Sequence, residues 1–191
     1  MSTSESNQNR RMYIVAPALA LLLLMFSANT HAAEKLEGPK LGRPASPQEI
    51  AAWDMSVFPD GKGLPPGSGT AVEGKTVYDS QCASCHGPKG MGGSAEELAG
   101  GKHGLTEPDP DKTIGTYWPH ATTIFDFVRR SMPLDKPASL SDNQVYAVTA
   151  YLLYLNGIIG EQMDMNATTL PQVRMPNREG FVWIDVPQDR K

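Results

Sequence analysis

Two cysteines and a histidine stand within five positions, in the string Cys82-Ala83-Ser84-Cys85-His86. This C-x-x-C-H spacing is typical of c-type haem attachment, because the two thiols lie on one side of a helix and can add to the two vinyl groups of the macrocycle. His86 follows immediately, so its imidazole can bind the iron from the proximal side. The alternatives are a thioredoxin-like redox pair, which lacks a surrounding βαβ pattern, and half of a zinc site, which lacks another cysteine pair because the chain has only 2 cysteines. We therefore predict one covalent haem c at Cys82 and Cys85, with His86 as an axial ligand.

An iron with one histidine ligand needs a sixth ligand, and Met132 is the best candidate. It follows a predicted helix and precedes Pro133, in a hinge that could carry it across the open haem face. A thioether ligand would raise the reduction potential, whereas a gap-filling core methionine is the alternative role of this residue. Met175 also precedes a proline and is the second choice, and a histidine ligand would give a bis-histidine haem of lower potential. The remaining candidates are Met91, Met163, Met165, His103 and His120.

Two aromatic residues, Tyr117 and Trp118, precede Pro119 near the start of a predicted helix. Their O–H and N–H groups could contact haem propionates, and simple packing is an equally good alternative. Arg129 and Arg130 could neutralise propionates or form a docking patch, although a solvated helix end is the simpler interpretation. No Ser-His-Asp arrangement and no nucleotide-binding motif is convincing, so we assign no catalytic residue.

Three helices are predicted to position these groups. Thr70 and Glu73 form a capping box at the start of a helix that runs to the cysteines. A second helix spans about 122–131 and stops before a proline. Ser141 opens the third helix, whose apolar residues recur at three- and four-residue spacing until Gly157. No alternating strand pattern interrupts this core, so the fold class is all-α, and a bound prosthetic group would fill the long loop between the first two helices.

The first 32 residues have the three-part pattern of a secretory signal. Arg10 and Arg11 form a basic start, residues 12–26 are an apolar run, and a segment of small residues with a cleavage site follows. A spanning helix needs about 20 apolar residues, so an uncleaved membrane anchor is the weaker interpretation. We predict a signal peptide at 1–32 and a periplasmic protein with no stable membrane span after signal cleavage.

The mature chain is predicted to consist of a Pro/Gly-rich arm (33–69), a haem-binding core (70–157) and a tail (158–191). One short helix in the arm is expected after Ser46, with Pro47 at its first position. Apolar residues in the arm and tail argue against disorder, and we expect both segments to wrap over a partner subunit; the alternative is that they fold back on the core. These residues are Trp53, Val57, Phe58, Met163, Met165, Leu170, Val173, Met175, Phe181 and Trp183.

The charge of the chain excludes one class of partner. The formal net charge is −4 at pH 7, and 20% of the residues are charged while 40% are hydrophobic. An acidic surface repels the phosphate backbone, so we predict no nucleic-acid partner.

The haem string, the Met132-Pro133 pair and the amphipathic third helix make residues 70–157 resemble a class I cytochrome c, a fold of three to five helices around one haem. Further segments resemble the cytochrome subunit of sulfane dehydrogenase in the sulfur-oxidising (Sox) system. They are Leu41-Gly42-Arg43-Pro44-Ala45, Ala51-Ala52-Trp53-Asp54, Gly63-Leu64-Pro65-Pro66-Gly67-Ser68-Gly69, Tyr117-Trp118-Pro119-His120-Ala121-Thr122-Thr123, Val145-Tyr146-Ala147-Val148-Thr149-Ala150-Tyr151 and Met175-Pro176-Asn177-Arg178.

The resemblance implies haem attachment at Cys82 and Cys85 and axial ligation by His86 and Met132. In that family the cytochrome takes electrons from a molybdenum subunit that oxidises sulfur bound to a carrier protein. Typical members carry two haems, whereas this chain has a single C-x-x-C-H. A related cytochrome that serves a sulfite-oxidising molybdenum enzyme is therefore an alternative.

The predicted function is single-electron transfer by a periplasmic monohaem c-type cytochrome. A molybdenum-containing sulfane or sulfite dehydrogenase would be the electron donor, and a downstream cytochrome or oxidase would be the acceptor. Two alternatives stay open: a haem enzyme such as a peroxidase, which would need an open sixth site, and a general soluble electron carrier unrelated to sulfur oxidation. A thiosulfate-oxidising haem protein with a cysteine axial ligand is disfavoured, because the chain has no third cysteine.

Overall fold

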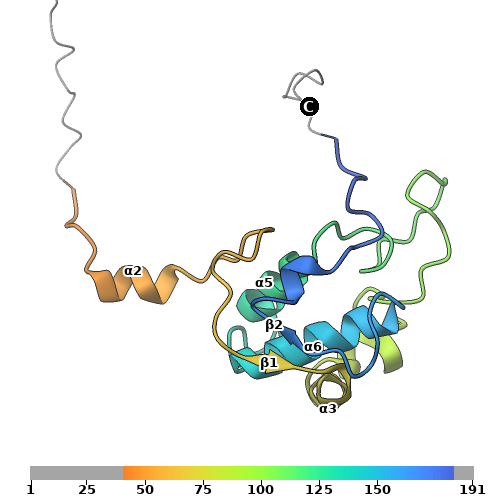
Figure 1. Ribbon diagram of the computed structural model, residues 1–191, viewed down its shortest axis with the longest axis horizontal. Coiled ribbons are helices and arrows are strands. Elements are labelled where there is room, and N and C mark those ends of the chain that lie inside the picture. The colour runs from red at the N-terminus through yellow and green to blue at the C-terminus, as the bar shows by residue number, and fades with distance from the viewer. Residues whose placement is uncertain (1–40, 183–191) are drawn as a thin grey trace, which may run out of the picture. The chain divides into compact units, whose positions relative to one another are not determined.

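The computed structural model describes residues 41–182 of the chain (Figure 1). The predicted signal peptide, the first part of the arm and Trp183 lie outside the described residues. The chain separates into two units, residues 1–45 and 46–191. The described part of the first unit, 41–45, is an exposed segment without helix or strand. The second unit holds the helices and strands that follow.

Helices dominate the core, as the sequence predicts. They are α3 (Ala71–Gln81), α4 (Ala83–His86), α5 (Ala121–Ser131) and α6 (Asp142–Leu155). The last of these, α6, packs against both α3 and α5 (Figure 1). Nine consecutive residues of α6, 145–153, are buried, so this helix is the centre of the hydrophobic core.

The two longest predicted helices begin where their capping boxes predict. The Thr70 hydroxyl accepts the Glu73 N–H, and the Glu73 carboxylate accepts the Thr70 N–H at 2.8 Å. Ser141 and Gln144 make the same reciprocal pair at the start of α6. Each box satisfies two N–H groups that a helix start otherwise leaves without a partner. α5 has no side-chain cap and begins one residue earlier than the sequence predicts.

Two glycines allow the backbones of α3 and its preceding strand to approach α6 closely. A Cβ atom on Gly74 would lie 1.9 Å from the carbonyl oxygen of Ala147, and one on Gly69 would lie 2.6 Å from the Ala147 nitrogen. No side chain can be accommodated at such distances. The close approach packs α3, the helix that leads to Cys82, directly against the central helix.

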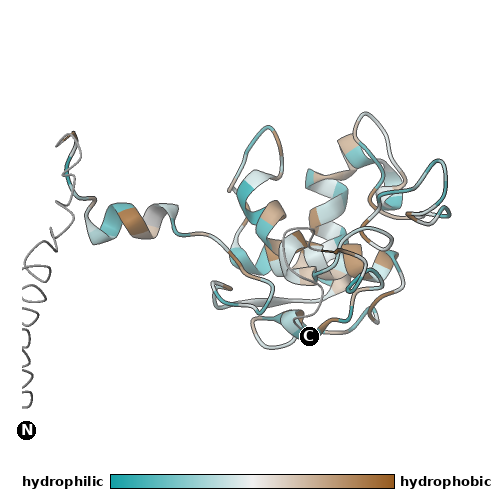
Figure 2. Ribbon diagram, turned by 90° about the horizontal axis from the view of Figure 1, so that it is seen from above, coloured by the Kyte–Doolittle hydropathy of each residue, from teal (hydrophilic) through white to brown (hydrophobic). Residues whose placement is uncertain are grey.

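Short elements complete the fold: α2 (Pro47–Trp53), β1 (Ser68–Gly69), the 3₁₀ turns η2 (Pro88–Gly90) and η3 (Leu170–Gln172), and β2 (Met165–Asn166). α2 is the predicted arm helix, and Ser46 and Glu49 form its capping box. Figure 2 shows a band of apolar residues on α2. β1 and β2 pair antiparallel, with Ser68 opposite Asn166 and Gly69 opposite Met165. The sequence shows no sign of this pairing, because two-residue strands carry no alternation.

The tail packs on the core of its own chain, which differs from the expectation that it wraps over a partner. Four apolar tail residues are buried members of the core cluster: Met165, Leu170, Val173 and Met175. The arm contributes Val57 to the same cluster. Burial of these side chains removes apolar area from water without a second protein, so the fold-back alternative describes the tail up to Met175.

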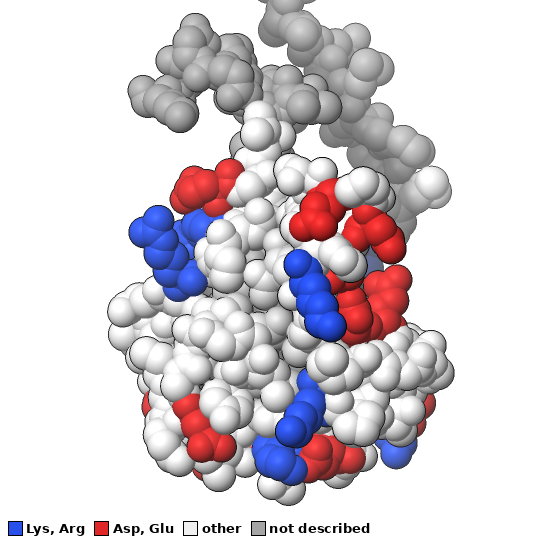
Figure 3. All heavy atoms as spheres, turned by 90° about the vertical axis from the view of Figure 1, so that its right-hand side faces the viewer, with Lys and Arg blue, Asp and Glu red and all other residues white. Residues whose placement is uncertain are grey.

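The surface carries both signs of charge. On the face that Figure 3 shows, Lys and Arg side chains are interspersed with Asp and Glu, and the described residues there form no extended basic patch. Within residues 41–182, no helix is both long and apolar enough to cross a membrane.

Candidate haem site

A cavity of about 750 Å³ lies where the end of α3, the short α4, the end of α5 and one side of α6 meet. This volume is within the range of pockets that hold small-molecule ligands. The lining residues are Tyr78, Ser80, Gln81, Cys82, Ser84, Cys85, His86, Ser94, Ala95, Leu98, Val128, Met132, Pro133, Leu134, Asp135, Lys136, Val148 and Leu152. The cavity therefore brings together both cysteines, His86 and Met132, four residues that the sequence selects for haem binding.

Both cysteines are free thiols at the cavity wall. Cys82 caps the end of α3, and Cys85 lies in α4, one helical turn further along. Burial, and next the neighbouring Cys85, raises the pKa of the Cys82 thiol to about 11. Cys82 is half-buried and Cys85 is exposed, and both line the same cavity.

His86 is oriented by a backbone carbonyl. Its Nδ1 lies 2.9 Å from the carbonyl oxygen of Glu96. A carbonyl oxygen can only accept, so Nδ1 carries the proton and the lone pair is on Nε2. Such a second contact is the usual way to fix the tautomer and the ring orientation of a metal-binding histidine. The imidazole is thus prepared to bind iron through Nε2.

The chain after His86 is held by a dense set of hydrogen bonds. Gly92 N–H donates to the His86 carbonyl, and Ala95 N–H donates to the Cys85 carbonyl, both at 2.9 Å. The buried Tyr78 hydroxyl donates to the Gly87 carbonyl at 2.8 Å. Burial raises the pKa of Tyr78 to about 12, so the phenol stays protonated and donates at neutral pH.

Tyr78 belongs to the site although no sequence motif marks it. The available signal was its position four residues before Cys82, which places the two side chains on one face of a helix. Its partner is a carbonyl that no motif marks, so the hydrogen bond itself could not be predicted.

Met132 lies at the end of α5 and is half-buried. Its N–H donates to the Val128 carbonyl at 3.1 Å, and Pro133 follows it in the cavity wall. Among the described methionines, Met132 alone lines the cavity. This placement supports Met132 as the sixth ligand, which stays a prediction.

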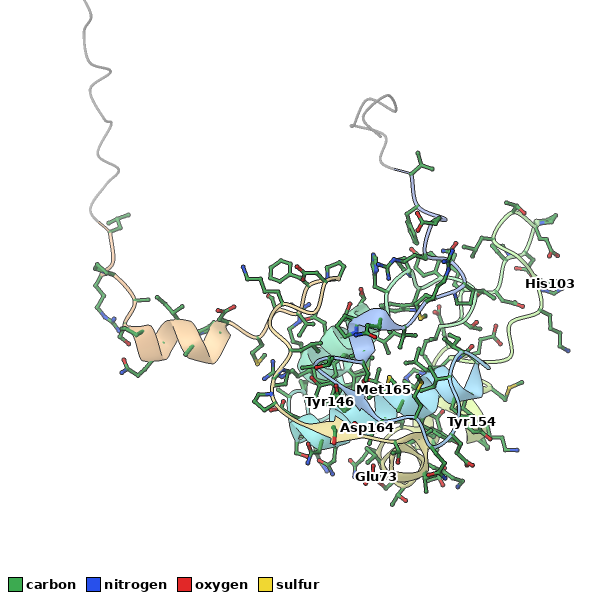
Figure 4. All side chains as sticks on the ribbon, in the orientation of Figure 1. Glu73, His103, Tyr146, Tyr154, Asp164 and Met165 are labelled. Atoms are coloured by element: carbon green, nitrogen blue, oxygen red, sulfur yellow. The ribbon has the colours of Figure 1, made fainter. Side chains whose placement is uncertain are left out.

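The other candidate ligands lie elsewhere. Met165 and Met175 are fully buried in the core, whereas Met91 and Met163 are exposed. His103, which is labelled in Figure 4, lies on a projecting loop. Its ring nitrogen Nδ1 is 3.5 Å from the Asp111 carboxylate. His120 precedes α5, and its Nδ1 is buried without a partner among the described residues. Burial, and next Arg178, lowers the pKa of His120.

Tyr117 and Trp118 do not line the cavity. Tyr117 packs edge-on against Phe181, with ring centroids 5.4 Å apart, and Trp118 packs edge-on against Phe127 at 6.0 Å. These contacts fit the packing alternative. Contact of the two residues with haem stays a prediction that the cavity lining does not support.

The two arginines of α5 are engaged in contacts within the protein. Arg129 forms an ion pair with Asp142 at 3.3 Å, and Arg130 pairs with Asp126. Neither arginine lines the cavity. Arg129 thus connects α5 with α6, whereas Arg130 pairs within α5 and its side chain stays 47% exposed.

The donor set fits a covalently attached haem. Two free thiols three residues apart, an imidazole with Nε2 available and one thioether share a cavity with the apolar side chains Leu98, Val128, Val148 and Leu152. Thiols can form the covalent links, nitrogen and sulfur can bind iron axially, and the apolar wall can exclude water from the macrocycle.

Comparison with known proteins agrees with this geometry. The family model of cytochrome c matches residues 71–156, which include all four of these donors. The crystal structure of the sulfane dehydrogenase SoxCD from Paracoccus pantotrophus matches with a TM-score of 0.71 and 47% sequence identity, over 80% of this chain and 74% of that chain. The chain belongs to the class I c-type cytochromes.

Membership of the cytochrome c family implies covalently bound haem c. The cytochrome is also similar to a thiosulfate dehydrogenase from Stutzerimonas stutzeri (strain A1501), with 36% identity over 91 residues. That match covers 46% of this chain but only 28% of the length of the relative. Both of these proteins are named as dehydrogenases of sulfur compounds.

Proposed function

We propose that this cytochrome is a periplasmic monohaem electron carrier that accepts single electrons from a molybdenum-containing sulfane or sulfite dehydrogenase, as its subunit or partner. A downstream cytochrome or oxidase then receives the electrons. The observation that carries the proposal is the cavity shared by Cys82, Cys85, His86 and Met132. The 47% identity to the sulfane dehydrogenase structure supports the choice of sulfur chemistry.

Each donor has a defined role in this proposal. Cys82 and Cys85 would hold the haem through thioether bonds, His86 would bind the iron through Nε2, and Met132 would bind it through sulfur. When bound, haem supplies a one-electron couple whose potential the protein tunes. A thioether ligand raises that potential, which favours acceptance of electrons from the dehydrogenase. With both His86 and Met132 as ligands, the iron would have no position left for a substrate, so the cytochrome would transfer electrons without binding the sulfur compound itself.

The dehydrogenase partner is tested by purifying the native complex and measuring molybdenum in the haem-containing fractions. We expect molybdenum to co-elute, and we expect sulfite or carrier-bound sulfane to reduce the haem only in the presence of the co-eluting subunit. Absence of molybdenum, together with a haem that stays oxidised with both substrates, would contradict the proposal. Reduction by thiosulfate with the cytochrome alone would instead favour a thiosulfate-oxidising enzyme.

The carrier role is tested by adding cyanide to the ferric protein. Because Met132 would close the sixth position, we expect weak binding that strengthens markedly in Met132→Ala. Tight binding to the unmodified protein would indicate an open site of the kind that a peroxidase needs.

A further inference from the structure

The segment that carries Met132 has few backbone restraints of its own. It runs from Met132 to Ser141, between α5 and α6. Between positions 133 and 140, the described backbone forms one hydrogen bond, from the Lys136 N–H to the Pro133 carbonyl (2.9 Å). Leu134 in this segment is 80% exposed. Met132 itself ends α5 and packs against the core, so the path of the chain that follows it depends on what holds the two ends of the segment.

An ion pair joins those two ends. Arg129 lies one turn before Met132 in α5, and Asp142 is the first residue of α6. The Arg129 Nε atom is 3.3 Å from Asp142 Oδ1, and the two side chains are 22% and 39% exposed. A contact between the ends of a segment with one internal backbone hydrogen bond limits the conformations that the segment can adopt.

The helix on which Arg129 stands is itself fixed to the arm. Thr122, Asp126 and Arg129 lie on one face of α5, and each contacts the backbone of residues 55–59. The carboxylate of the buried Asp126 accepts the Val57 N–H at 2.9 Å. The Thr122 hydroxyl donates to the Pro59 carbonyl at 3.4 Å, and Arg129 Nη1 donates to the Met55 carbonyl at 3.5 Å. Arg129 therefore lies on a helix that is hydrogen-bonded to the arm, and its ion pair connects this helix with the start of α6.

We propose that Arg129 is a positioning residue for Met132. Its ion pair with Asp142 closes the base of the segment 132–141 and keeps the thioether in the haem cavity. This inference rests on Met132 as the sixth ligand in the proposed function. It predicts that loss of the pair lets an added ligand displace Met132 more easily, while the attachment of haem at Cys82 and Cys85 is unchanged.

The test is a titration of the ferric holoprotein with imidazole, followed by its absorption spectrum. We expect Arg129→Gln and Asp142→Asn each to raise the apparent affinity for imidazole by about threefold or more. The double variant should show no further gain, because either single change already removes the pair. Arg129→Lys should restore part of the wild-type value.

The matched control is the exposed pair of Lys75 and Asp79 on α3. Lys75→Gln removes an ion pair within a single helix, far along the sequence from Met132, and it should leave imidazole affinity unchanged. Amide hydrogen exchange should rise in residues 132–141 of Arg129→Gln and not in α3. Thermal unfolding of each variant separates a local effect from a general loss of stability.

Three results would overturn the inference. The first is an unchanged imidazole affinity in Arg129→Gln, even if its thermal stability falls. The second is full additivity of Arg129→Gln and Asp142→Asn. The third is wild-type imidazole affinity in Met132→Ala, which would also refute Met132 as the ligand; the first two leave that ligand in place.

Discussion

The two sides of the haem cavity are built in different ways. On the side of His86, residues 85–96 are tied together by hydrogen bonds from backbone to backbone, from the Tyr78 hydroxyl and from the His86 ring. On the side of Met132, the ten-residue segment has one internal backbone hydrogen bond and is closed by the side chains of Arg129 and Asp142. The His86 side is therefore held by many hydrogen bonds, whereas the Met132 side is a loop closed by one ion pair.

This difference suggests that the two predicted axial ligands, His86 and Met132, have different roles. A histidine next to two covalent attachment points, with its ring fixed through Nδ1, has little freedom to leave the iron. Met132 ends α5, but the segment after it is closed only by a partly exposed ion pair, so the methionine has less to hold it. We therefore expect changes on the His86 side to decide whether haem is bound at all, and changes on the Met132 side to decide how the iron behaves.

The largest effect is expected from replacing the attachment thiols. The variant with Cys82→Ser and Cys85→Ser should retain no covalent haem, because no other cysteine can form a thioether. Acid–acetone extraction followed by denaturing gel electrophoresis with haem staining measures this. Ser84→Ala, between the two cysteines, is the control and should keep its haem. Extractable haem in the unmodified protein would refute covalent attachment.

The next largest effect is expected on the Met132 side of the cavity. Met132→Ala should keep covalent haem but lose the weak charge-transfer band near the red edge of the ferric spectrum, and it should bind cyanide at least tenfold more tightly. Met175→Ala is the control, since Met175 is buried in the core away from the cavity wall. If Met175→Ala loses the band and Met132→Ala keeps it, the ligand assignment is wrong.

The tail offers a third region, in which methionine acts only through packing. Met175 is 1% exposed, so Met175→Ala should lower the free energy of unfolding by about 2–5 kcal/mol through the cavity that it leaves. Met163→Ala, at an exposed position, should change it by less than about 0.5 kcal/mol. Chemical denaturation monitored by circular dichroism measures both. Equal stability of the two variants would mean that the tail does not form part of the core.

The smallest effect is predicted on the His86 side of the cavity. Tyr78→Phe removes one buried hydroxyl and leaves the Gly87 carbonyl without its donor, which should cost about 1–3 kcal/mol of stability. Tyr154→Phe, on an exposed side chain of α6, is the matched control. A Tyr78→Phe variant as stable as the wild type would show that this hydrogen bond does not restrain the His86 side.

Local signals in the sequence predicted much of this structure. The capping boxes at Thr70 and Ser141 fixed helix starts, and C-x-x-C-H with Met132-Pro133 selected four residues that line one cavity. The pairing of β1 with β2 and the burial of Met165 and Met175 were not predicted, because they depend on contacts between segments far apart in the chain. The same reason explains why the ion pair of Arg129 was not predicted: its partner Asp142 lies in another helix.

The central claim is that a fixed histidine and a displaceable methionine hold a single covalent haem. Near-infrared magnetic circular dichroism of the ferric protein tests it most directly, because the energy of the charge-transfer band depends on the pair of axial ligands. With one haem per chain established by haem and protein assays, we predict a band typical of histidine–methionine ligation. A band typical of bis-histidine ligation would contradict the account and move the sixth ligand to a histidine such as His103 or His120.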